Sequence, residues 1–108
     1  MRGEELKGHI DTIVLAALAD EPAHGYALVA RVRSRSDDVL DVGEGTIYPA
    51  LHRLERDGLI ESTWEKASGR RRRVYAITRA GSAQLGERRE DWRAFARGMQ
   101  ALLGGGGA

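Results

Sequence analysis

The chain of 108 residues contains no cysteine and no long apolar run. The first absence excludes disulfides, thiolate metal sites and cysteine nucleophiles. The second excludes a membrane-spanning helix, which needs about 20 apolar residues in succession. Glu4 and Glu5 stand where a signal peptide would need its apolar segment. We therefore expect a soluble, cytoplasmic protein with no membrane partner.

Signals of catalysis and of cofactor binding are also missing. The three histidines, His9, His24 and His52, lie far apart in the sequence and have no cysteine beside them, so we expect no metal site. No serine stands in a nucleophile-elbow motif, and the chain has neither a phosphate-binding loop nor a dinucleotide fingerprint. The sequence therefore indicates a protein that is not an enzyme and uses no cofactor.

Positive charge is scarce overall but concentrated in one place. The formal net charge is only +1, and residues 1–40 contain 5 basic and 7 acidic side chains. By contrast, the segment from Lys66 to Arg79 contains 6 basic residues and no acidic one. A local basic patch of this kind suits contact with a phosphate backbone, whatever the net charge. The patch favours double-stranded DNA as the partner, and the near-neutral total leaves a protein-binding module as the alternative.

Apolar residues at steps of three and four predict helices in the first part of the chain. One apolar face runs from Leu6 to Leu18, in a helix that ends near Pro22. A second helix begins near His24 and turns its leucine and valine side chains inward. The arginines expected on its outer face are Arg31, Arg33 and Arg35. A polar connection follows, from Asp37 to Asp41.

A third helix has apolar residues at 47, 51 and 54 and stops at Gly58, which suits a left-handed C-terminal cap. Beyond it the period changes to two, and runs at 60–64 and 74–77 predict a β-hairpin that turns at Gly69. Thr78 can cap a last helix over residues 79–103. Three short helices followed by a two-stranded wing form a winged helix-turn-helix, in which the third helix reads DNA.

The expected fold is mainly α with a small β-hairpin, and it combines a winged helix-turn-helix with a long C-terminal dimerisation helix. Residues 1–78 are expected to form the DNA-binding domain and residues 79–103 the dimerisation helix. Residues 104–108, a glycine-rich tail, are expected to be disordered because they have no side chains to bury.

The front of the third helix combines residues that form helices poorly but suit contact with DNA. Free N–H groups of a first turn can bind a phosphate, and glycine lets DNA approach the backbone. Pro49 is harmless in a first turn, but it is interior and should kink the helix if the helix starts at Gly43. Taken alone, this stretch also fits an ordinary loop and helix start. The candidate DNA contacts are Gly45, Thr46, Tyr48, Pro49, His52 and Arg53.

Four arginines follow the predicted turn of the hairpin. Side chains alternate along a strand, so they should divide between its two faces. A charge run is usually a solvated surface, but this one lies at the tip of a wing. We expect Arg70, Arg71 and Arg72 to contact DNA, and Arg73 to lie along the sheet and pair with an acidic neighbour.

The last helix carries a bulky apolar stripe that three short helices cannot cover, and Arg88 and Arg89 interrupt it. Such a stripe usually pairs with its copy in a second subunit. Trp92 is more often interface core than a platform for a flat ligand, and both roles stay open. The expected dimer interface combines this stripe with two residues of the first helix, Leu6 and Ile10. From the last helix it comprises Leu85, Trp92, Phe95, Ala96, Met99, Leu102 and Leu103.

The segments "EPAHGYAL", "EGTIYPALHRLERDGLI" and "GRRRRVYAIT", together with "LKGHIDTIVLAAL", Gly81 and Trp92, resemble the PadR family of bacterial transcriptional regulators. The resemblance runs from about residue 6 to residue 92. Only one helix follows the wing, as in the compact branch of that family. Two features depart from the family pattern, namely Gly43, where serine is frequent, and the ending "GGGGA".

The resemblance implies a homodimeric repressor that binds an inverted repeat near its own or a neighbouring promoter. Family members are often released from DNA by aromatic compounds, so a planar aromatic effector is implied as a further partner. By position, the resemblance places Tyr26 and Lys7 near the DNA surface, with Tyr26 at a phosphate. It also places Trp92 where some compact members stack planar drugs.

Overall fold

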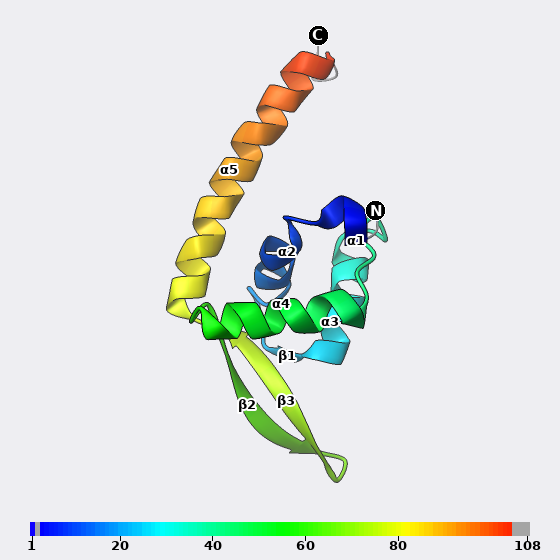
Figure 1. Cartoon of the computed structure of the whole chain (residues 1–108), viewed down its shortest axis with the longest axis vertical. Coiled ribbons are helices and arrows are strands. Elements are labelled where there is room, and N and C mark those ends of the chain that lie inside the picture. Colours follow the sequence, from blue (N-terminus) through cyan, green and yellow to red (C-terminus); the bar gives the residue numbers. More distant parts are fainter. Residues whose placement is uncertain (2, 105–108) are drawn as a thin grey trace.

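The computed structural model describes Met1 and residues 3–104, and its elements are arranged as in Figure 1. The predicted disorder of the tail falls mostly on residues 105–108, outside the described residues. In chain order the elements are α1 (Gly3–Leu6), α2 (Ile10–Ala17), β1 (Ala23–His24), α3 (Gly25–Arg35), α4 (Glu44–Arg56), β2 (Ile60–Ala67), β3 (Arg70–Ile77) and α5 (Arg79–Leu103).

The first predicted helix is divided in two, which corrects the expectation of one continuous helix. α1 ends at Leu6 and α2 begins at Ile10. Between them Gly8 has a φ of +95°, a conformation that glycine tolerates and that ends a right-handed helix. Leu6 and Ile10 nevertheless both lie in the core, so the apolar pattern described burial correctly although it missed the break.

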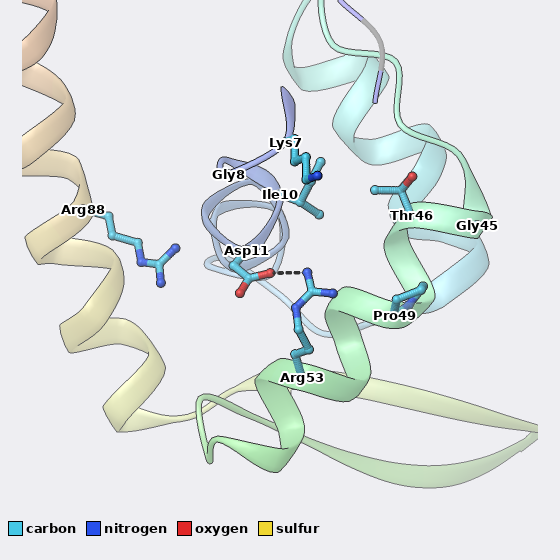
Figure 2. Close-up of a pocket in the computed structure, with 9 residues that line it drawn as sticks. All are labelled: Lys7, Gly8, Ile10, Asp11, Gly45, Thr46, Pro49, Arg53 and Arg88. Atoms are coloured by element: carbon cyan, nitrogen blue, oxygen red, sulfur yellow. Dashed lines mark hydrogen bonds and ion pairs between the residues drawn. The ribbon is translucent and has the colours of Figure 1, made fainter. Parts of the chain in front are cut away.

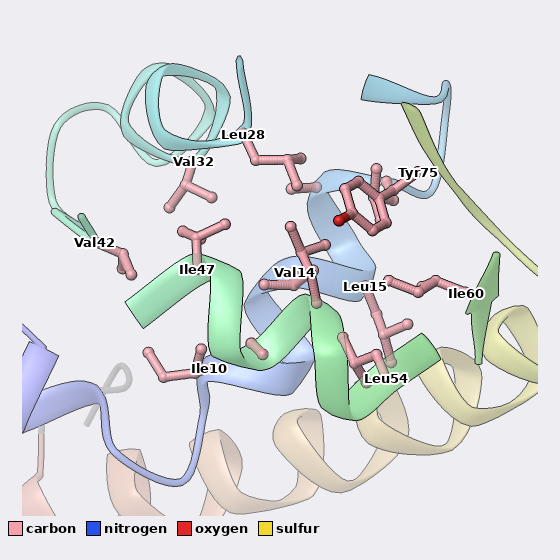
Figure 3. Packing of buried hydrophobic residues seen from close by; sticks show 14 of the residues in the cluster. Ile10, Val14, Leu15, Leu28, Val32, Val42, Ile47, Leu54, Ile60 and Tyr75 are labelled. Atoms are coloured by element: carbon pink, nitrogen blue, oxygen red, sulfur yellow. The ribbon is translucent and has the colours of Figure 1, made fainter. Parts of the chain in front are cut away.

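The core lies between α2, α3 and α4 and is closed at one end by the base of the sheet (Figure 3). Val14, Leu28 and Ile47 contribute from the three helices and are fully buried. Ile60 and Tyr75 extend the cluster onto β2 and β3. Full burial of one such aliphatic side chain stabilises a fold by about 1.5–3 kcal/mol. This cluster therefore fixes how α4 lies against the sheet.

Arg31 does not point outward as predicted. Its guanidinium donates to the carbonyl oxygens of Ala17 and Glu21, at 2.9 Å each, and forms an ion pair with the Glu21 carboxylate at 3.4 Å. The carbonyls after α2 have no helical partners, so a nearby arginine satisfies them. Arg31 therefore joins α3 to the end of α2. Arg33 and Arg35 are exposed, as expected.

α4 ends as the sequence predicts. Gly58 has a φ of +77°, its N–H donates to the Glu55 carbonyl at 3.0 Å, and the N–H of Leu59 donates to the Leu54 carbonyl at 2.9 Å. This pair of bonds defines a Schellman cap. Because the cap reverses the chain, β2 begins at once against the core.

The sheet has three antiparallel strands in the order β1-β3-β2. The hairpin of β2 and β3 turns through Ser68 and Gly69, whose φ angles of 53° and 77° match a two-residue type I′ turn. The third strand, β1, was not predicted. It places Ala23 opposite Tyr75 and His24 opposite Val74. β1 therefore attaches the start of α3 to the wing.

α5 begins at a tight junction and then leaves the rest of the molecule (Figure 1). Thr78 caps it by accepting from the Gly81 N–H at 3.0 Å, as predicted, and also donates to the Gly58 carbonyl at 2.8 Å. A Cβ on Gly81 would lie 2.0 Å from the Leu59 carbonyl oxygen, so only glycine fits there. The helix of 25 residues spans about 37 Å.

Candidate nucleic-acid interface

α4 presents one ridge to solvent while its opposite face fills the core. Its buried residues are Ile47, Ala50, Leu51 and Leu54. The exposed ridge consists of Gly45, Pro49, His52 and Arg56 at helical spacing. Thr46 and Tyr48 flank the ridge and are half-buried. All the α4 residues predicted to contact DNA are thus at or beside the free face of a well-anchored helix.

Pro49 lies inside α4, because the helix begins at Glu44 with Gly43 as its cap residue. Proline has no N–H, so the carbonyl of Gly45, four residues earlier, receives no helical hydrogen bond from position 49. The glycine has open space where a side chain would stand. The ridge therefore offers a stretch of backbone at Gly45 that no side chain covers. The kink expected for an interior proline stays a prediction.

Tyr48 lies flat against the start of α3. A Cβ added to Gly25 would lie 2.6–2.9 Å from the ring and hydroxyl atoms of Tyr48. A side chain at position 25 would therefore displace the ring of Tyr48. The contact explains why "HGY" and "TIY" occur in one chain, since the glycine of one motif makes room for the tyrosine of the other.

The junction of β1 and α3 brings two more side chains to this place. Tyr26 is 69 % exposed and stacks on His24, with ring centroids 6.5 Å apart. His24 caps α3, because its Nδ1 accepts from the Ala27 N–H at 3.2 Å. These residues, with Arg72 and Arg73 of the wing and the buried Tyr75, line a cavity of about 510 Å³ beside Tyr48.

The strand register divides the four wing arginines between two faces. Partners directly opposite in an antiparallel pair share a face. Arg73 is opposite Trp64 and Arg71 opposite Lys66, which places these on one face, whereas Arg72 is opposite Glu65 on the other. Arg70 follows the same alternation as Arg72. The predicted contacts Arg70, Arg71 and Arg72 are all exposed, but they do not form a single surface.

Trp64 organises one face of the wing, a role that the sequence did not reveal. The guanidinium carbons of Arg71 and Arg73 lie 4.8 Å and 5.3 Å from the centre of its ring. A cation over an indole face is attracted by the ring quadrupole. Trp64 therefore holds both arginines close to the strand. A tryptophan that alternates with polar residues opposite an arginine run is a signal that could have suggested this contact.

Arg73 also joins the wing to α4, which confirms that it pairs with an acidic neighbour. Its Nε donates to the Ser62 hydroxyl at 2.8 Å, and its Nη2 lies 3.8 Å from the Glu55 carboxylate. Ser62 in turn donates to Glu55 at 2.5 Å. Burial raises the pKa of the neighbouring Tyr75 phenol, although the positive charge of Arg73 acts against this rise. The network fixes the wing relative to the reading helix.

A second cavity, of about 770 Å³, lies on the other side of α4 (Figure 2). Arg53 points into it and donates to the Asp11 carboxylate at 2.8 Å. The expected DNA contact from Arg53 is therefore qualified, because part of its guanidinium is already used within the chain. Arg88 donates to the hydroxyl of Thr12 at 2.8 Å. Lys7, Gly45, Thr46 and Pro49 also line this cavity.

The apolar stripe of α5 is mostly uncovered. The large hydrophobic side chains exposed on it are Trp92, Phe95, Met99, Leu102 and Leu103, and Ala96 beside them is half-buried. Leu6, Ile10 and Leu85, predicted at a dimer interface, are instead 3 %, 7 % and 2 % exposed in the single chain. The core of one chain already covers these three, so little of their surface is left for a partner, and their place in the dimer interface stays a prediction.

Trp92 lies where α5 passes α2. Its ring meets the edge of His9 at 5.9 Å and that of Phe95 at 5.6 Å between centroids, yet it stays 57 % exposed. The described part of the chain contains no group of three or more His, Asp or Glu residues placed to hold a metal ion. Among its helices, none has the length and apolar character required to cross a bilayer.

A helical core, a reading helix with a free ridge and a small antiparallel wing define a winged helix-turn-helix protein. Comparison with known families is more specific. Residues 14–87 match the transcriptional regulator PadR-like family. The chain is also 41% identical over 92 residues to the transcriptional regulator Rv3488 of Mycobacterium tuberculosis, covering 85% of this chain and 80% of that protein. The chain belongs to the PadR-like family, whose members are transcriptional regulators rather than enzymes.

Solved structures agree with this assignment. A PadR-like transcriptional regulator from Bacillus cereus superposes with a TM-score of 0.81 at 32% identity, covering 96% of this chain and 100% of that one. Bacillus subtilis PadR, solved in complex with operator DNA, has a TM-score of 0.67 at 19% identity and covers 73% of this chain and 45% of that one. The second likeness concerns the fold alone.

Proposed function

We propose that this protein regulates transcription by binding promoter DNA as a homodimer, with α4 in the major groove and the wing on the neighbouring backbone. One observation carries the proposal: the tyrosines of the "HGY" and "TIY" motifs, which lie beside the solvent-facing ridge of α4, line one cavity with Arg72 and Arg73 of the wing. A helix with a free face suits base contacts, and arginines suit phosphates. Bacillus subtilis PadR, which shares this fold, was solved in complex with operator DNA, and this supports DNA as the partner.

The exposed stripe of α5 supports dimer formation. Five large hydrophobic side chains from Trp92 to Leu103 stay exposed on one helix, which a stable monomer would rarely tolerate. Two copies related by a twofold axis would cover the stripe with itself. They would also present two reading helices to an inverted repeat. We infer repression as the outcome, because a dimer lying across a promoter blocks access to it in the cytoplasm.

The exposed ring of Trp92 supports control by a planar aromatic effector. Its neighbours His9 and Phe95 lie nearly perpendicular to it, and the ring stays 57 % exposed, so part of it is open to a stacking ligand. The same ring can pack against the partner subunit. A ligand that stacks there would alter the distance between the two reading helices and release the DNA.

Fluorescence anisotropy with labelled duplexes tests the proposal. The protein should bind its own upstream DNA more tightly than a scrambled duplex, and binding should weaken steeply with salt. Arg71→Ala should weaken binding to both duplexes and reduce the salt slope by about one. Arg33→Ala, at an exposed arginine in the last turn of α3, is the matched control and should change neither value.

Two results would contradict the proposal. Absence of binding to any duplex at low salt would exclude DNA as the partner and favour a protein-binding module. An Arg71→Ala variant with unchanged affinity and salt slope would remove the wing from the interface. Adding planar aromatic compounds to the bound complex tests the effector, since an effector must lower the anisotropy at unchanged protein concentration.

A further inference from the structure

The cavity beside Tyr48 brings Arg72 and His24 together, and the tautomer of His24 decides whether they can bond to each other. The Nη1 atom of Arg72 lies 3.3 Å from the Nε2 atom of His24. On the other side of the same ring, Nδ1 accepts the N–H of Ala27 at 3.2 Å and so caps α3. A neutral imidazole carries one N–H. The cap requires a lone pair on Nδ1, and in the tautomer that provides it the ring proton is on Nε2.

The consequence is a pair of donors that face each other. A guanidinium has five N–H donors and no acceptor, so Arg72 has nothing to accept the N–H of His24. In the described part of the chain no carboxylate lies within ion-pair range of Arg72, even though Glu65 is opposite it in the ladder. Both donors are therefore available to one acceptor that enters from outside.

The surroundings identify the chemistry of that acceptor. The cavity is lined by Tyr26 and Tyr48, whose hydroxyls add further donors, and by no acidic residue. A phosphate oxygen accepts several hydrogen bonds at once, and charge-assisted bonds from arginine are among the strongest. The cavity also lies where the start of α3, the reading helix and the wing meet. A DNA backbone beside a major-groove helix would pass through this place.

We propose that His24 is a phosphate-binding residue, which donates from Nε2 to the same backbone phosphodiester that Arg72 holds. The proposal rests on the function proposed above and adds one residue and one contact to it. The helix cap sets the role of each ring nitrogen of His24, because an acceptor at Nδ1 keeps the N–H donor at Nε2. The residue thus performs two tasks, one with each ring nitrogen.

The two tasks can be separated by substitution. Asparagine is among the best N-cap residues, so His24→Asn keeps an acceptor for the Ala27 N–H and loses the outer donor. Its melting temperature should equal or exceed that of the wild type, while its affinity for a duplex selected in vitro and for a scrambled duplex should fall by about three- to tenfold. The salt slope should not change, because a neutral donor releases no counterion.

Arg72→Gln supplies the contrast. It should weaken binding and also lower the salt slope by about one, because a phosphate loses its cationic partner. The double variant should bind less weakly than the product of the two single effects predicts, since both residues act on one phosphate. Duplexes with single uncharged methylphosphonates then locate that phosphate. At one position the methylphosphonate should lower the affinity of the wild type. At that same position it should cause no further loss of affinity in either variant.

Each alternative result has a defined meaning. If His24→Asn binds DNA as tightly as the wild type, or if no methylphosphonate position is shared, the role of His24 is overturned. The proposed function stays intact in both cases. Failure of the wild-type protein to bind any duplex overturns both. Nitrogen-15 NMR of the free protein gives a readout without DNA, in which a proton on Nδ1 of His24 would contradict the proposal. Millimolar inorganic phosphate should not shift these signals, and a saturable shift would assign the cavity to free phosphate instead.

Discussion

The two halves of α5 differ in what covers their apolar side chains. In the first half, residues 79–91, the helix starts against Gly58 and Leu59, which join α4 to β2, and Leu85 is only 2 % exposed. In the second half, residues 92–103, Leu102 is 84 % exposed and Leu103 is 76 % exposed. One continuous helix with one apolar stripe thus passes from complete burial to nearly complete exposure.

The difference separates two sources of helix stability. The first half is held by tertiary contacts within the chain, namely the Thr78 cap, the close approach of Gly81 to Leu59 and the burial of Leu85. In the second half Trp92 meets His9 of the same chain, but Leu102 and Leu103 stay exposed. Isolated helical segments of about a dozen residues are marginal in water. We therefore expect its stability to depend on the second copy of the chain in the proposed dimer. Substitutions in the two halves should therefore affect different equilibria.

The largest expected effect comes from truncating the stripe in each half. Leu85→Ala removes a buried side chain and should lower the free energy of unfolding by about 3 kcal/mol. Leu102→Ala removes an exposed one and should leave the unfolding of a single chain nearly unchanged, while it weakens self-association. Urea denaturation at several protein concentrations, combined with sedimentation equilibrium, measures both quantities.

The two variants also test whether the two halves of α5 differ in what stabilises them. If Leu102→Ala leaves the sedimentation of the protein unchanged, the exposed stripe is not the dimer interface. If Leu85→Ala costs no more stability than Leu102→Ala, the first half is not anchored as the structure has it. Glu87→Ala, at an exposed polar position in the first half, controls for a general effect of alanine in α5.

Replacing either of two glycines of α5 by alanine should change the stability of the protein by a smaller amount, with opposite signs at the two positions. Gly81→Ala places a methyl group 2.0 Å from the Leu59 carbonyl oxygen and should destabilise the protein by about 1–3 kcal/mol. Gly98→Ala meets no atom of the chain within 4 Å and should stabilise the helix by up to about 1 kcal/mol. Thermal unfolding of both variants measures the difference. Equal stabilisation by both would mean that α5 does not begin in close contact with Leu59.

Much of the fold follows from local signals in the sequence. Gly58, Gly69 and Thr78 were predicted as a helix cap, a turn residue and an N-cap, and the structure confirms all three. Each signal is local, because a positive φ or a capping hydroxyl affects only adjacent residues. β1 was missed because two residues, Ala23 and His24, are too few to produce a periodic pattern.

The candidate site was less accessible to sequence reasoning. The motifs around Tyr26 and Tyr48 indicated a DNA-binding surface, but the contact of Tyr48 with Gly25 joins residues that are far apart in the chain. The same holds for Arg53, which pairs with Asp11 of α2. Sequence patterns show which side chains are polar and where they lie on an element. They do not show which partners the fold brings to those side chains.

The smallest expected effect is a loss of stability at high pH, caused by the buried Tyr75 at the base of the wing. Tyr75 is 3 % exposed, and burial raises the pKa of its phenol above the ordinary value of 10.0. The folded state therefore holds this proton more tightly than the unfolded state does. Its contribution to stability is complete below pH 10 and is lost as the pH rises through the folded pKa. Tyr75→Phe removes the proton, so unfolding measured between pH 9 and pH 12 should show a smaller alkaline loss in the variant than in the wild type. An equal loss in both would mean that other groups cause it and that the base of the wing admits water freely.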